Sequence, residues 1–389
     1  MTPDALPTGA PPRAPAVAAV GVTFLATVLA WAFLKAESQA AVGWIAAGAV
    51  VAVLAAARVG ALRWAARGAI ENERTTGLAL TVSLALLLAA FHEDHFTLLL
   101  LARVLVIAMA CLGLHVQFGM TGVVNFAGAA FFGVGSYTAA LLAGGALPHP
   151  IVLAAGGGAA ALVGSVLLLP LLRTRGHYAA LVTIAFGLLF RTFIEVNDTL
   201  GGPQGLNVPG MRLLGFSFNE GWSAGGVEFS FYVAYVALAF LLLAGAFGVV
   251  RRLETSWVGL ALDAVRLDET AAASFGVRVP GWKIAAFTLG NLITGVAGAL
   301  SAMITAYIAP NNFTFQESLV LVSIVLLGGI GNAWGLLVAS FIVVVVPEKL
   351  QAIQEFRFLL FASLVILVLV FRPSGLVPRA LRRHIGGPA

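Results

Sequence analysis

The charged residues between positions 263 and 283 are the first candidates for chemistry in this sequence. Six charged side chains occur in this stretch, although only 10% of the chain is charged and 60% is apolar. Asp263, Arg266 and Glu269 recur every three residues, so one helix would bring opposite charges together on neighbouring turns. The spacing therefore predicts a charged helical surface.

The segment 256–276 is expected to form that helix as one piece, because it is rich in good helix-forming residues. Leu262, Val265 and Ala272 fall on other faces than the charges, as in an amphipathic helix. Gly276 is expected to end this helix. Such a helix can lie on a membrane surface as an anchor or present a face to a soluble protein. The residue pattern leaves both alternatives open.

Other reactive patterns carry less weight. The run "HEDH" at 92–95 has side chains that bind metals, but an ordinary solvated turn is the expected interpretation. A P-loop requires Gly-Lys followed by Ser or Thr. None of the three lysines of the chain follows a glycine: these are Lys35, Lys283 and Lys349. The chain is therefore expected to bind no metal or cofactor and to be no enzyme.

The composition predicts a membrane protein. The apolar content of 60% exceeds the roughly 45–50% of ordinary globular proteins, and the mean hydropathy is +1.00. Many apolar runs approach the roughly 20 residues that a helix needs to cross a bilayer, so we expect an all-α polytopic protein with about 10–12 transmembrane helices, some short or broken. The isoelectric point near 9.8 is then explained by membrane topology, and no nucleic-acid partner is expected.

The apolar runs locate the spans. Two of them, 317–330 and 334–347, are short for a bilayer, so they form either two short spans or one re-entrant hairpin. The spans are expected at approximately 16–34, 40–57, 75–91, 97–118, 127–145, 150–171, 178–196, 229–250, 284–307, 317–330, 334–347 and 357–372.

The basic residues orient these spans. Sixteen of the 22 Lys and Arg residues fall on one side and four on the other. Lys and Arg accumulate in cytoplasmic loops, so the first side is the cytoplasm. The two termini and the segment 251–283 are therefore expected inside, and the Gly-rich segment 198–228 outside.

Two glycine-rich interruptions, "GMTGVVN" at 119–125 and "GGIGN" at 328–332, break long apolar stretches and end in Asn. Broken helices at comparable places in two halves are a pointer to a solute path, and Thr121 and Asn125 are then expected to face it. Close packing of small residues is the equally weighted alternative.

Ionisable residues inside the expected spans are few. Arg191 and Glu195 are one helical turn apart and can pair. We expect either a buried structural ion pair or a role along the solute path. His115 is expected to be a hydrogen-bonded residue of its span.

Several motifs resemble one family in order along the chain. "LDETAAASFGV" is similar to the D-E-x-A-A-x-x-x-G loop of bacterial ABC-importer permeases. "GMTGVVNFAGAAFFGVGSYTAALL", "LRTRGHYAALVTIAFGLLFR" with "GGPQGL", "FTFQESLVLVSIVLLGGIGNAWG" and "FRPSGLVP" resemble segments of the LivM-type permeases of branched-chain amino-acid ABC importers. Ser136 replaces the usual Ala of one motif. Leu188 replaces a Glu of another, which puts the particular solute in doubt.

The resemblance implies a division of the chain and a set of partners. The partners would be a second permease of the LivH type, two cytoplasmic ATPase subunits that bind ATP and Mg²⁺, a periplasmic solute-binding protein and the lipid bilayer. The location would be the bacterial inner membrane. The expected parts are an N-terminal extension over 1–96 with about three spans, a permease domain over 97–378 and a cytoplasmic tail over 379–389.

The resemblance also implies two sets of functional residues. The residues expected along the solute path are Thr121, Gly122, Asn125, Ser136, Tyr137, Arg191 and Glu195. The residues expected in a helix that couples to the ATPase are Gly259, Asp263, Arg266, Asp268, Glu269, Ala271, Ala272 and Gly276. In that helix Ala271 and Ala272 are expected to allow close approach of the partner.

The alternatives to this function are other solutes, an ion-coupled transporter and a membrane scaffold. Relatives of such permeases carry urea, short amides or other amino acids. An ion-coupled secondary transporter is the rival from another class, and it needs intramembrane carboxylates or broken helices to bind ions. A membrane scaffold without transport explains neither the charged helix nor the glycine interruptions.

Overall fold

The computed structural model describes most of the chain. It divides into two compact units, one made of Met1–His92 with Pro347–Glu355 and the other of Glu93–Val346 with Phe356–Ala389. The described residues are 14–36, 38, 40–45, 48, 68, 72–172, 177–213, 215–224, 227–349, 359, 363, 366 and 375.

Some expectations fall on other parts of the sequence. Most of the expected spans 40–57 and 357–372, the basic residues Arg173 and Arg175, and the tail 379–389 lie outside the described residues. The domain boundary at residue 96 stays a prediction.

The first unit contains two apolar helices that pack against each other, α1 (Ala14–Lys35) and α4 (Glu73–Ala90). The C-terminal end of α1 is tied to a distant part of the chain, because Lys349 Nζ donates to the Leu34 carbonyl at 2.6 Å. Both helices agree with the spans expected at 16–34 and 75–91.

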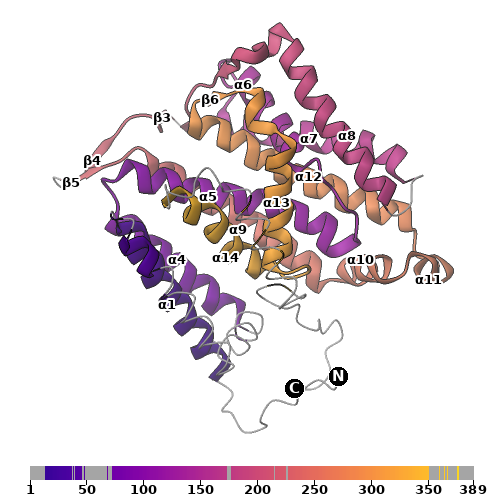
Figure 1. Cartoon of the computed structure of the whole chain (residues 1–389), viewed down its shortest axis with the longest axis horizontal. Helices are drawn as coiled ribbons and strands as arrows, with labels where there is room; N and C mark the ends of the chain where they lie inside the picture. The colour runs from indigo at the N-terminus through magenta and orange to yellow at the C-terminus, as the bar shows by residue number, and fades with distance from the viewer. Residues whose placement is uncertain are drawn as a thin grey trace. The chain divides into compact units, whose positions relative to one another are not determined.

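The second unit is built from long helices (Figure 1). Five helices of the described residues are long and apolar enough to cross a membrane: His95–Met120, His149–Pro170, Tyr178–Val196, Tyr232–Thr255 and Val279–Thr305. The prediction of an all-α polytopic membrane protein is confirmed. The main helices of this unit are α5 (His95–Leu114), α6 (Gly128–Leu142), α7 (His149–Leu171), α8 (His177–Val196), α9 (Tyr232–Thr255), α12 (Val279–Thr305), α13 (Phe315–Gly328) and α14 (Ala333–Lys349), of which the last three residues are assigned to the first unit.

Helix α12 lies at the centre of the second unit, packed against α5, α6 and α7. The packing is close because small residues face each other. A Cβ at Gly298 would lie 1.9 Å from the Phe132 carbonyl oxygen of α6, and one at Gly135 would lie 2.0 Å from the Gly295 carbonyl oxygen. Larger residues at these positions would force the helices apart.

The glycine-rich segment 198–228 has more structure than a plain connector. It begins with the 3₁₀ turns η2 (Asp198–Leu200) and η3 (Gly202–Gln204). Its short antiparallel strand pairs are β2 (Arg212–Leu213) with β3 (Phe216–Ser217) and β4 (Trp222–Ala224) with β5 (Val227–Phe229). Strand β1 (Leu206–Asn207) pairs with β6 (Tyr307–Ile308) after α12.

The expected single helix at 256–276 is two helices, α10 (Trp257–Leu267) and α11 (Glu269–Ser274). Asp268 separates them, with φ −157° and ψ 109°, and its carboxylate accepts from the amides of Thr270 and Ala271. The prediction of one continuous helix was wrong because Asp268 is an N-cap residue. We call residues 257–274 the α10–α11 arm, which joins α9 to α12 in the sequence and lies at the lower right of Figure 1.

Candidate functional site: a broken helix joined to the α10–α11 arm

The α-helical hydrogen bonding of α5 ends at Leu114, but the helix itself does not end there. It continues as one π-helical turn, η1 (His115–Met120), and the chain then leaves the helix at Thr121 and Gly122. Gly122 has φ +74°, a conformation that glycine adopts without strain. The break predicted at 119–125 is therefore confirmed, and we call residues 115–125 the helix break.

Buried hydrogen bonds hold the helix break in place. Gln117 Nε2 donates to Asn291 Oδ1 of α12 at 2.8 Å, and Gln117 Oε1 accepts from Asn125 Nδ2 at 2.7 Å. Asn125 Oδ1 accepts from the Ala127 amide at 2.8 Å, just before α6 begins, and Thr121 Oγ1 donates to the Gln117 carbonyl at 2.6 Å. Thr121 and Asn125 therefore lie together in one polar network.

This network is closed in the conformation described. Gln117 and Asn291 are fully buried, and Asn125 is 3% exposed. A void of about 10 Å³ next to Asn125 is lined mainly by apolar side chains of the helix break and of α13, together with Leu114. This volume is roughly the space of one water molecule. A solute passing Asn125 would require the helices to separate.

The second glycine interruption lies next to the first. Gly329 and Gly331, with φ +111° and +90°, form the turn between α13 and α14. A Cβ at Gly119 would lie 3.3 Å from the Gly331 amide nitrogen. Asn332 accepts from the Trp334 amide at 3.0 Å and so caps α14. The two breaks found in the sequence are neighbours in space.

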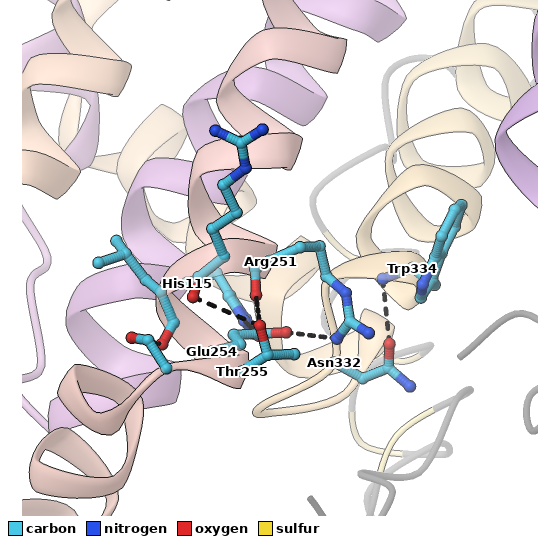
Figure 2. Close-up of polar contacts among 9 residues, drawn as sticks. His115, Arg251, Glu254, Thr255, Asn332 and Trp334 are labelled. Carbon is cyan, nitrogen blue, oxygen red and sulfur yellow. Dashed lines mark hydrogen bonds and ion pairs between the residues drawn. The ribbon is translucent and has the colours of Figure 1, made fainter. Parts of the chain in front are cut away.

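A buried charged cluster adjoins this meeting point (Figure 2). His115 Nε2 lies 3.1 Å from Glu254 Oε1, and Arg251 Nη1 donates to Glu254 Oε2 at 2.6 Å. His115 is fully buried and Glu254 is 1% exposed. The expectation that His115 is hydrogen-bonded is confirmed. Glu254 was not among the residues that the sequence pattern singled out, although it lies within the segment 251–283 expected inside.

The α10–α11 arm contacts the helix break. A Cβ at Gly122 would lie 3.4 Å from Arg266 Cγ, so Arg266 packs directly on the backbone of the break. Gly259 packs against the end of α9, where a Cβ would lie 2.4 Å from the Leu253 carbonyl oxygen. The arm is thus fixed both to α9 and to the break.

The faces of the arm differ in part from the expectation. Leu262, Val265 and Ala272 are all buried, which confirms the amphipathic pattern. Ala271 is exposed, whereas Ala272, which was also expected to allow close approach of a partner, is 5% exposed and packs inside the chain. Large exposed side chains lie at Leu267 and Phe275.

The charges of the arm also pair differently. Glu269 accepts from Lys283 Nζ of α12 at 2.5 Å rather than pairing along one helix with Arg266. Asp268 is used to cap α11. Gly276 has φ +82° and ends the arm as expected. Asp263 lies half-buried on α10.

The remaining solute-path candidates gather around η4 (Pro310–Phe313). Arg191 Nη2 donates to Glu195 Oε1 at 3.0 Å and to Asn311 Oδ1 at 3.2 Å. Tyr137 is buried, with its ring centroid 5.7 Å from that of Phe313. The pair of Arg191 and Glu195 is formed as expected, but its side chains are 38% and 34% exposed, so it is not a buried pair.

Ser136 differs from its neighbour Tyr137. Its hydroxyl donates to the Phe132 carbonyl at 3.0 Å and to the Gly298 carbonyl at 2.9 Å. It is 1% exposed and ties α6 to α12. In this structure Ser136 is a packing residue between two helices.

The "HEDH" run is a helix start. The Asp94 carboxylate accepts from the amides of Phe96 and Thr97, both at 3.1 Å, and so caps α5. His95 Nδ1 is 2.5 Å from the Ser230 hydroxyl. The local structure is a capped turn.

The long apolar helices and the broken helix are those of a multi-pass membrane protein. A family model described as "Branched-chain amino acid transport system / permease component" matches residues 96–371. The chain belongs to this family. No solved structure matches the chain significantly.

Individual relatives agree with the family match. The "High-affinity branched-chain amino acid transport system permease protein LivM" of Salmonella typhimurium is 34% identical over 282 residues, 69% of this chain and 66% of that protein. The LivM protein of Escherichia coli K12 is 33% identical over the same shares. The LivH permease protein of Salmonella typhimurium is 23% identical over 70% of this chain and 91% of that protein. The match thus spans slightly less than two thirds of the LivM proteins.

Proposed function

We propose that this chain is a transmembrane permease subunit of an ATP-driven importer for branched-chain amino acids. The family match over residues 96–371 carries the proposal. The contact of Arg266 with Gly122 supports it, because a protein bound to the α10–α11 arm can act directly on the helix break. The relatives named as branched-chain amino acid permeases support the solute class.

We propose a second permease of the LivH type as the membrane partner, since the chain resembles both LivM and LivH proteins. Two ATPase subunits would bind ATP and Mg²⁺, and one of them would dock on the α10–α11 arm. Leu267 is 77% exposed and Phe275 is 89% exposed, and large apolar side chains of this kind anchor protein interfaces. The permease itself would then perform transport without catalysing a reaction.

The proposed location is the inner membrane of a bacterial cell, with the two termini and the arm in the cytoplasm. The excess of basic residues on that side supports this orientation. A periplasmic binding protein would deliver the solute to the segment 198–228 on the opposite face.

Solute choice can be tested by reconstituting the permease pair with its ATPases and binding protein in liposomes. With ATP inside, we expect uptake of radiolabelled leucine, isoleucine and valine, and weak competition by urea or acetamide. Strong uptake of urea or acetamide with no uptake of leucine would contradict the proposed solute class. It would indicate that the replacement of the family's Glu by Leu188, which is 51% exposed on α8, goes together with a different solute.

A further inference from the structure

We propose that the buried pair of His115 and Glu254 is a positioning device that joins the α10–α11 arm to the helix break. In this proposal Glu254 holds the start of the break and Arg266 holds its end. Movement of the arm is therefore passed to residues 115–125 as a unit. The inference rests on the proposed function, in which a partner ATPase moves the arm.

The first attachment is at His115, the first residue of η1. Its Nε2 atom is 3.1 Å from Glu254 Oε1, and the second carboxylate oxygen accepts from Arg251. Both His115 and Glu254 are inaccessible to solvent. A charge-assisted bond in such surroundings is stronger and more directional than one at the surface, so it fixes the orientation of η1 relative to α9.

The arm is joined rigidly to the element that carries Glu254. Helix α10 begins two residues after the end of α9. At Gly259 a Cβ would lie 2.7 Å from the Glu254 carbonyl oxygen, so the two backbones are in contact there. A displacement of α10 must therefore displace the backbone of Glu254.

The second attachment is at Gly122. Arg266, near the C-terminal end of α10, packs its side chain on the Gly122 backbone. Gly122 has φ +74° and closes the helix, since its amide donates to the Phe118 carbonyl at 3.2 Å while Arg266 packs on its other side. The helix break is consequently held at His115 by α9 and at Gly122 by α10.

The ring of His115 also lies where the two glycine interruptions meet. A Cβ at Gly119 would be 2.8 Å from His115 Nδ1 and 3.3 Å from the Gly331 amide. His115 Nδ1 is buried and forms no hydrogen bond in the described structure. The ring therefore lies beside the π-turn and close to the turn between α13 and α14. Single π-turns inside helices frequently mark functional sites.

The test compares transport with ATP hydrolysis in the full complex of permeases, ATPases and binding protein. His115→Leu removes the bond to Glu254 but leaves Glu254 paired with Arg251. We expect the number of leucine molecules imported per ATP hydrolysed to fall at least about fivefold, the lower end of ordinary coupling between two sites. His115→Gln, whose amide can donate to Glu254, should recover most of the ratio.

Asp94→Ala is the matched control, because Asp94 caps the opposite end of the same helix α5. It should change the yield of complex but leave the ratio of leucine to ATP unchanged. A wild-type ratio in His115→Leu, or an equal loss of ratio in Asp94→Ala, would overturn the proposal. If His115→Leu yields no complex, Arg266→Ala is the deciding variant. A reduced ratio of leucine imported to ATP hydrolysed in Arg266→Ala supports the proposal, and a wild-type ratio overturns it.

The wild-type complex distinguishes a failure of the proposed function from a failure of the positioning role alone. Absence of ATP-dependent leucine uptake by the wild type would overturn the proposed function itself. Wild-type uptake together with unchanged ratios in His115→Leu and Arg266→Ala would overturn only the positioning role.

Discussion

Gly259 offers a quantitative test of how closely the α10–α11 arm is attached to α9. In Gly259→Ala the new Cβ would lie 2.4 Å from the Leu253 carbonyl oxygen and 2.7 Å from that of Glu254. Ordinary contact begins at 3.4 Å, so α10 must move away by about 1 Å, the difference between these distances. Both obstacles are backbone atoms, which cannot rotate away.

Overpacking of this kind costs about 1–3 kcal/mol. The stability gained by replacing a helical glycine with alanine, about 0.5–1 kcal/mol, offsets only part of that cost. We therefore expect the purified Gly259→Ala protein to melt a few degrees lower than the wild type. Because α10 is displaced, stimulation of the partner ATPase by the loaded binding protein should also weaken.

Gly281→Ala is the control for this substitution. Gly281 lies in the first turn of α12, and the nearest atom to a new Cβ there is 4.0 Å away. The same chemical change should leave the melting temperature equal to or above that of the wild type. If Gly259→Ala and Gly281→Ala melt alike in a thermal shift assay, the tight attachment of the arm is refuted.

Three further predictions concern the helix break, the end of the arm and the topology. Asn125→Leu removes the hydrogen bond to Gln117 and should lower the free energy of unfolding by about 1–3 kcal/mol. It should also abolish most leucine uptake, and normal uptake would show that Asn125 is only a packing residue. Gly276→Val should cost about 1–2 kcal/mol because of the positive φ, and a melting curve like that of wild type would contradict this. Single cysteines replacing Glu220 and Ser274, both exposed, should label from opposite sides of the membrane in a variant without native cysteine; labelling from one side would refute the orientation.

The spans and breaks were predictable because their signals are local in the sequence. Apolar runs located the helices, and the glycine run at 119–125 marked the end of α5. The split of the arm was also local: Asp268 before Glu269 and Thr270 is a typical helix start. The helix propensity of the whole segment outweighs this single capping residue, so the segment predicts one helix.

The contacts that assemble the site are not local. Glu254 follows two arginines, which is typical of a loop, and its burial depends on His115, 139 positions earlier. The pairing of Gln117 with Asn291 joins residues 174 positions apart. Polar residues inside apolar spans are a signal that could have drawn attention to Gln117 and Asn291. Their partners depend on how the helices pack, which the sequence pattern does not specify.

The most direct test of the proposed function is the energy source of uptake. Leucine import by the reconstituted complex should require ATP inside the liposomes and should continue when ionophores remove the proton and sodium gradients. Uptake that persists without ATP, and stops when the proton or sodium gradient is removed, would contradict the account and identify the chain as part of an ion-coupled carrier.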